Sequence, residues 1–171
     1  MTEWTASNGV LRRKGLLSGE IIRAGRVVDM FTANNLVTNE GLNHANDVLL
    51  HGTTQVATWY IGIFEGNYTP VATVTAATIA AAATETTAYA SATRPEYVEA
   101  ASSSQVTTNA ANRASFVFNA TKTIYGGFVV SSSTKGGTGG VLLAAIRFAT
   151  AKNVESGDEM LLTYAHTAES G

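Results

Sequence analysis

Apolar and polar residues alternate with a period of two through much of the second half of the chain, which predicts β-strands. Side chains of a strand point in turn to its two faces, and β-branched and aromatic residues favour this conformation. Four such runs are predicted, at residues 115–121, 123–131, 141–149 and 159–164. The glycine-rich segment 135–140 predicts a hairpin tip between the second and third runs.

These strands are apolar on both faces. The period of two places each of two residue sets on one face of its strand, namely Ile124, Gly126, Phe128 and Val130, and Leu142, Ala144, Ile146 and Phe148. The opposite faces, with Val129, Val141 and Leu143, are apolar as well. A sheet with one solvated face needs only one apolar face. We therefore expect the second face to be covered by a helix, by a long excursion of the chain, or by a neighbouring subunit.

The most apolar run of the chain, 58–64, is too short for a helix and predicts a central strand with both faces buried. Alternation separates two sets of side chains, Trp59, Ile61 and Ile63 on one face and Tyr60 and Phe64 on the other. Gly62 within this strand indicates the close approach of another backbone.

One segment, 39–51, has the period of an amphipathic helix. The residues that recur at steps of three and four are Leu42, Ala45 and Leu49. Thr38 or Asn39 is suited to the N-cap, because its side-chain oxygen can accept a hydrogen bond from a free amide of the first turn. We expect this helix to lie on the sheet with its apolar stripe against the core.

Residues 71–93 form an excursion that is rich in alanine and threonine. The alanines, with Thr75 as N-cap, predict a short helix, whereas the threonines equally favour an extended chain. An excursion of this length on a small β-domain is expected either to contact neighbouring subunits or to form a surface loop.

Near the N-terminus, residues 20–31 predict a hairpin with Ala24 and Gly25 at its tip, since glycine adopts the positive φ that such turns require. Ser18 and Gly19 are expected to interrupt the segment before it.

About seven to nine strands at spacings of about 8–12 residues favour a sandwich over a closed barrel. The fold class predicted is mainly β, an antiparallel β-sandwich of jelly-roll type with one short α-helix packed on it. Two parts are expected, an N-terminal basic arm and hairpin at 1–33 and a single β-sandwich domain at 34–171.

Composition favours an assembly. The 171 residues suffice for one domain, but only 14% are charged and the mean hydropathy is +0.08, both unusual for a small monomer. We expect a homo-oligomer or a protein docked on another protein. No apolar run reaches the ~20 residues that span a bilayer, the start has no signal-peptide pattern, and there is no cysteine for a disulfide.

The net charge of −2 is unevenly distributed, with five basic and two acidic residues among the first 26. Arg12, Arg13 and Lys14 form a candidate arm for docking on an acidic surface. The alternative is a solvated strand edge whose charges prevent aggregation. The low total charge argues against nucleic-acid binding.

Patterns that could support catalysis, a metal or a cofactor are all better explained by structure. Ser132 and Lys135 have the spacing of an acylating serine motif but lead into a hairpin rather than a helix. The glycines at 136–140 lack the lysine and hydroxyl residue of a phosphate-binding loop. The three histidines are too far apart for one metal ion: His44, His51 and His166.

Two further groups of residues were considered for chemistry. Glu96 and Glu99 have no neighbouring acid–base context. The aromatic residues that could form a platform for a sugar are Trp4, Trp59, Tyr60, Tyr97 and Tyr125, although Trp59 and Tyr60 are better explained as core. We therefore predict no catalytic residue, no cofactor and no metal site, and expect that the protein is not an enzyme.

Several segments, taken in chain order, resemble a group of tailed-bacteriophage virion proteins. They are 35–43 (NLVTNEGLN), 59–64 (WYIGIF), 85–90 (ETTAYA) with 92–95 (ATRP), 119–128 (NATKTIYGGF) and 131–137 (SSSTKGG). The similarity spans roughly residues 34–164. Proteins of this group are described as head decoration, cement, head-fibre or tail-associated, so the resemblance implies a structural role and no catalytic residues.

The expected function is that of a decoration or cement protein, which binds and stabilises the outer capsid surface. Its expected partners are the major capsid protein of the same phage and further copies of itself, with no nucleic acid and no membrane. Its expected location is the capsid surface of the virion, after assembly in the host cytoplasm. The alternatives are a tail or baseplate adaptor and a jelly-roll carbohydrate-binding module.

Overall fold

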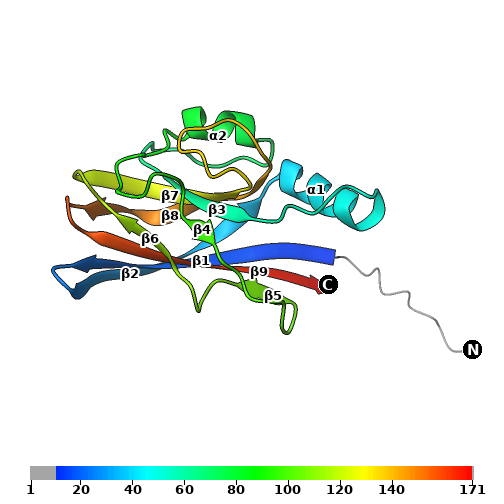
Figure 1. Ribbon diagram of the computed structural model, residues 1–171, viewed down its shortest axis with the longest axis horizontal. Coiled ribbons are helices and arrows are strands. Elements are labelled where there is room, and N and C mark those ends of the chain that lie inside the picture. The colour runs from blue at the N-terminus through cyan, green and yellow to red at the C-terminus, as the bar shows by residue number, and fades with distance from the viewer. Residues whose placement is uncertain (1–10, 171) are drawn as a thin grey trace, which may run out of the picture.

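The computed structural model describes residues 11–170, which form two layers of antiparallel strands with two short helices (Figure 1). The predicted antiparallel β-sandwich is confirmed, with one helix more than expected. The strands are β1 Leu11–Arg23, β2 Arg26–Val37, β3 Trp59–Phe64, β4 Glu96–Tyr97, β5 Val106–Thr108, β6 Ala114–Val117, β7 Lys122–Val130, β8 Leu142–Val154 and β9 Glu159–Ser170. The helices are α1 Asn39–Leu50 and α2 Ala76–Ala82.

Hydrogen-bonded neighbours follow one path through both layers, in the order β4-β3-β7-β8-β2-β1-β9-β5, and β6 also pairs with β9. β2 joins the layers, because most of it pairs with β1 whereas Asn35–Val37 pairs with β8. We call β4, β3, β7 and β8 the upper sheet, and β2, β1, β9, β5 and β6 the lower sheet, after their places in Figure 1.

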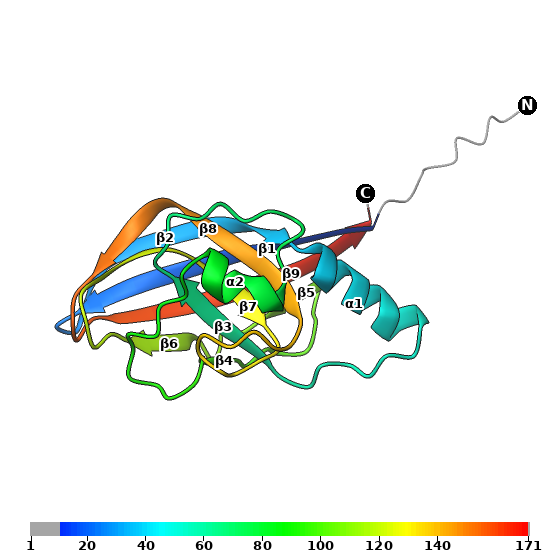
Figure 2. The same ribbon diagram turned by 90° about the horizontal axis from the view of Figure 1, so that it is seen from above.

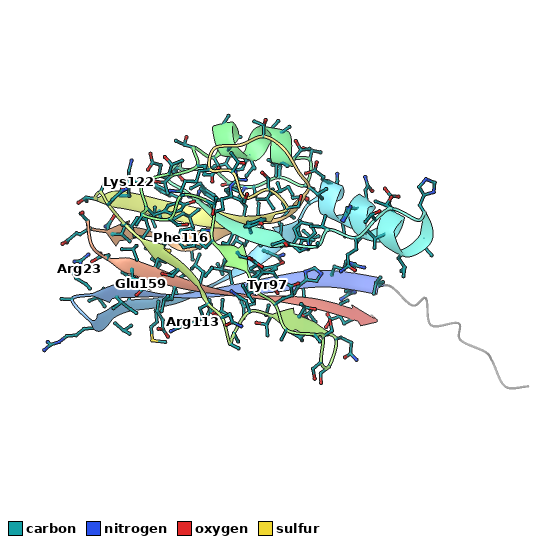
Figure 3. All side chains as sticks on the ribbon, viewed as in Figure 1. Arg23, Tyr97, Arg113, Phe116, Lys122 and Glu159 are labelled. Atoms are coloured by element: carbon teal, nitrogen blue, oxygen red, sulfur yellow. The ribbon has the colours of Figure 1, made fainter. Side chains whose placement is uncertain are left out.

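The main core lies between the two sheets. Leu17 of β1 and Phe116 of β6 are fully buried in it, and Figure 3 shows Phe116 between the layers. The inward residues of β9 are Met160, Leu162 and Tyr164, as alternation predicted. Burial of side chains of this size contributes most of the stabilisation of such a domain.

A second apolar cluster lies on the outer face of the upper sheet, beneath α2 (Figure 2). Ile79 of α2 is fully buried there, in a cluster with Phe64 of β3 and Phe128 of β7. Of the two alternatives left open for the alanine-rich tract, the structure has the short helix, with Thr75 as N-cap. A helix, a long excursion or a neighbouring subunit was expected to cover the second apolar face. On the upper sheet this face is covered by the excursion 71–93 of the same chain.

The expectation of unbroken alternation in β7 and β8 is wrong. The pairing of these strands shifts register between Ile124 and Gly126, and an irregularity of this kind moves later side chains to the other face. As a result Ile124 lies in the main core, whereas Phe128 lies beneath α2. A second shift places Leu142 beneath α2, while the rest of its predicted set lies in the main core: Ala144, Ile146 and Phe148.

Ser18 and Gly19 do not interrupt the N-terminal segment as expected, because β1 continues through them to Arg23. A Cβ atom at Gly19 would collide with the ring of Phe31, so this glycine allows close packing within a strand. The predicted boundary between residues 33 and 34 lies inside β2. The hairpin and the C-terminal strand therefore belong to one sheet.

Helix α1 begins and ends where predicted but is oriented differently. The amide of Gly41 donates to the Thr38 hydroxyl oxygen at 3.0 Å, which confirms the N-cap. Gly41 is the one buried residue of the helix and packs on the backbone of Leu143. Leu42 and Leu49 are 37% and 69% exposed. The prediction that the apolar stripe lies on the sheet is wrong, because α1 meets the sandwich through its first turn and extends beyond it (Figure 2).

Candidate docking surfaces

The segment that had suggested an acylating serine is engaged in structural contacts. The Lys135 ammonium donates to the carbonyls of Thr87 and Tyr89 at 3.3 and 2.8 Å and lies 3.7 Å from the centre of the Tyr89 ring. Burial lowers the pKa of Lys135. The Ser132 carbonyl accepts a hydrogen bond from Arg94 at 2.9 Å. The hairpin is thus fastened to the excursion, and it does not join a nucleophile to a base.

Sequence reasoning missed a buried ion pair under this hairpin. Arg94 donates to both carboxylate oxygens of Glu85, at 2.8 and 2.6 Å, and the two side chains are 0% and 1% exposed. The same carboxylate accepts from the Gly136 amide at 2.9 Å. The available signal was two opposite charges nine residues apart, Glu85 within the excursion and Arg94 directly after it, in a stretch that is otherwise uncharged. Their role is to connect the excursion to the hairpin.

The histidines and the paired glutamates do not converge on a site. His44 contacts the edge of Trp59, with 6.0 Å between ring centres, whereas His51 is exposed just after α1. Glu96 and Glu99 are exposed. Within residues 11–170, no three side chains of histidine, aspartate or glutamate are placed to hold a metal ion.

An open groove of about 480 Å³ lies between α1 and the adjoining end of the sandwich. We call it the α1 groove. Its walls and floor are mainly apolar and include Ala45, Val48, Leu49, Val56, Trp59 and Leu143. Arg13, Glu99 and His166 add polar atoms to this lining. Among the described residues neither Arg13 nor Glu99 has an ion-pair partner, so the groove combines apolar surface with one unpaired charge of each sign.

His166 is part of a short polar chain at this end of the main core. The Asn35 amide donates to the Tyr164 hydroxyl oxygen at 2.7 Å, and that oxygen lies 3.3 Å from Nδ1 of His166. Burial, together with the positive charge of Arg13, lowers the pKa of His166. Because desolvation disfavours the charged imidazolium, this histidine is neutral at neutral pH.

The three residues of the predicted docking arm lie on β1 and do not form one patch. Alternation directs Arg13 to the α1 groove and Arg12 and Lys14 to the other face of the lower sheet. The Lys14 ammonium lies 2.9 Å from a carboxylate oxygen of Glu169. The remainder of the predicted arm, residues 1–10 with Trp4, lies outside the described residues.

A second uncovered surface is the outer face of the lower sheet, formed by outward side chains of β2, β1, β9 and β6. We call it the lower outer face. Its exposed apolar residues include Leu16, Met30 and Val117, which are 45%, 69% and 44% exposed. Ser18 and Thr32 lie between them, paired across β1 and β2. Neither helix lies on this face, since α2 is on the opposite side of the molecule and α1 at one end (Figure 1).

No protein-family model matches this chain, and no curated protein is significantly similar to it in sequence. Within residues 11–170, neither helix has the length and apolar character needed to cross a membrane.

Proposed function

We propose that this protein is a structural component of a tailed-phage virion and binds the outer surface of the assembled capsid. The observation that carries the proposal is the α1 groove, which lies beside a helix whose last leucines, Leu49 and Leu50, are 69% and 82% exposed. Apolar surface of this kind favours burial against a partner. The resemblance of residues 34–164 to virion proteins supplies the biological setting.

The partner segment is expected on the major capsid protein, and its chemistry follows from the groove. Its apolar side chains would lie against Trp59 and Leu49. An aspartate or glutamate of that segment would face Arg13, because burying a guanidinium without an opposite charge is unfavourable. The mechanism of stabilisation would be the repetition of modest contacts over the many equivalent positions of a shell.

Binding of Leu49→Asp to capsids that lack this protein tests the groove. We expect the substitution to reduce occupancy at least about tenfold, since it places a charge in an apolar interface. Val71→Asp is the matched control, because Val71 is an exposed apolar residue outside the groove, at 52% exposure. Equal occupancy of Leu49→Asp and the wild type would contradict the proposed docking site.

The number of copies per particle separates a capsid role from a tail role. Several hundred copies, counted from stained gels or a cryo-electron map, are expected for a shell of many equivalent positions. A count of about six or twelve would instead match the symmetry of a tail ring.

A carbohydrate-binding module is the second candidate, favoured by one observation. Trp59 is half-buried and lines the α1 groove together with Gln55 and Glu99, a combination of an aromatic ring and polar groups that suits a sugar. A glycan array on which both the wild type and Trp59→Ala give no signal would remove this candidate.

A further inference from the structure

We infer that the lower outer face binds the same face of a second copy of this chain, around a two-fold axis that lies in the interface and perpendicular to the strands. Such an interface is isologous, so each contact between two different residues occurs twice. The inference concerns a surface separate from the α1 groove, and it does not depend on the proposed function.

The centre of the lower outer face is uncharged. Leu16 of β1 pairs with Ala165 of β9, and two residues further along β1, Ser18 pairs with Thr163 of β9. On its other side Ser18 pairs with Thr32 of β2. Small and apolar side chains of this kind allow two sheets to pack face to face at about 10 Å.

Two ion pairs flank this centre. In one of them β1 carries the cation, and in the other β1 carries the anion. Toward one end, Lys14 of β1 pairs with Glu169 of β9 at 2.9 Å. Toward the other end, Glu20 of β1 pairs with Arg113 at 2.8 Å. Arg113 precedes β6, which lies on the far side of β9, so its side chain reaches Glu20 across β9. Figure 3 shows Arg113 on the lower side of the molecule.

The proposed axis brings opposite charges together on both strands. Lys14 and Glu20 lie three residues to either side of Leu17, so a two-fold axis near Leu17 places Lys14 over Glu20 of the second copy. On β9, Glu169 is the pairing partner of Arg12, and the Arg113 side chain reaches the level of Glu20. The point halfway between Arg12 and Glu20 along β1 is residue 16, next to the proposed axis. The same axis therefore places Glu169 close to Arg113 of the second copy.

One other arrangement is disfavoured by the same charges. An axis parallel to the strands and above β1 would stack Lys14 on Lys14 and Glu20 on Glu20, and opposition of like charges penalises an interface. An axis parallel to the strands but between β1 and β9 would bring Lys14 near Glu169 of the second copy, and a mixture of charge-reversed variants distinguishes this arrangement from the antiparallel one.

The size of the face is compatible with a specific dimer. Ten residues of β1 at about 3.3 Å each and four strands at about 4.8 Å give roughly 600 Å². Specific interfaces bury upward of about 600 Å² on each partner. A dimer at this lower limit is expected to dissociate on dilution. In such a dimer the two α1 grooves point in opposite directions, so it would bridge neighbouring capsid subunits, a consequence that rests on the proposed function.

Sedimentation over a range of concentrations tests the inference with the full chain. We expect the wild type to reach a dimer, and Lys14→Glu alone or Glu20→Lys alone to weaken dimerisation about tenfold to hundredfold, because each places like charges in two contacts. A mixture of the two variants is expected to form heterodimers with the wild-type affinity, since all contacts between Lys14 and Glu20 positions become attractive again.

Leu16→Asp is expected to abolish the dimer, with Val98→Asp as the matched control at a similar exposure of 42% against 45%. Thermal unfolding at a monomeric concentration verifies that each variant folds. A wild type that stays monomeric at all concentrations would overturn the inference and leave the capsid proposal intact. If Lys14→Glu formed heterodimers with the wild type but not with Glu20→Lys, the antiparallel axis would be overturned.

Discussion

The outer faces of the two sheets differ in what covers them, although the sheets share one core. On the upper sheet, α2 places Ile79 over Phe128, and both side chains are fully buried. On the lower sheet, Leu16 and Met30 remain 45% and 69% exposed among serine and threonine side chains. The chain thus completes one face by itself and leaves the other as mixed apolar and polar surface. Such a surface can stay in water and can also bind, whereas the upper face could not be exposed without cost.

Charged residues show the same contrast. Under the 131–140 hairpin of the upper sheet, Arg94 and Glu85 are almost fully buried, whereas Arg113 and Glu20 of the lower outer face retain side-chain exposures of 36% and 25%. A buried pair must keep both partners, because a single buried charge is strongly unfavourable. An exposed pair is worth little to the monomer, and its charges remain available to a partner.

Loss of the buried ion pair should change the stability of the protein more than any other substitution considered in this comparison. Arg94→Met is expected to lower the free energy of unfolding by about 3–5 kcal/mol, because Glu85 is left as an uncompensated buried charge. Arg113→Met should cost less than about 1 kcal/mol. Urea denaturation at a concentration where the protein is monomeric measures both. The double variant Arg94→Met with Glu85→Gln should be more stable than Arg94→Met alone, and similar costs for the two single variants would contradict the contrast.

Truncation of apolar side chains on the two outer faces should differ by a smaller amount. Ile79→Ala is expected to cost about 2–5 kcal/mol, since it removes buried methyl groups and leaves a cavity beneath α2. Met30→Ala, at an exposed position of the lower outer face, should change stability by no more than about 0.5 kcal/mol. A measured cost of Met30→Ala close to that of Ile79→Ala would show that the monomer covers its lower face.

The smallest expected effect is a pH dependence of stability, caused by His166 on the inner side of the lower sheet. The pKa of His166 is below its ordinary value of 6.5, so the unfolded chain binds a proton more readily than the folded one. Stability should therefore be fully present above pH 6.5 and decrease as the pH falls below it, by at most about 1.4 kcal/mol per pH unit. His166→Gln should reduce this slope in thermal unfolding between pH 5 and 7. An unchanged slope would assign the pH dependence to other groups.

Local features of the sequence were sufficient to predict most of the elements. Ala24 and Gly25 both adopt positive φ, 49° and 75°, and form the predicted tip between β1 and β2. Thr38 caps α1 as its hydroxyl chemistry predicts. Gly62 is closely packed as expected, but the prediction that its neighbour is another backbone is wrong, because the atoms that approach it belong to the Phe128 ring. These features depend on residues a few positions apart or on one residue type, which is why a single sequence predicts them.

By itself, then, the sequence determined the β-rich class, the strands and turns, and the excess of apolar faces over what one solvated sheet needs. Only the tertiary structure decided which faces are covered. The register shift after Ile124 moved Phe128 beneath α2, and α1 packs on Leu143 through Gly41 while its leucines stay partly or largely exposed. The physical reason is that a face is a property of pairing between distant strands, and a shift of one residue exchanges core for surface.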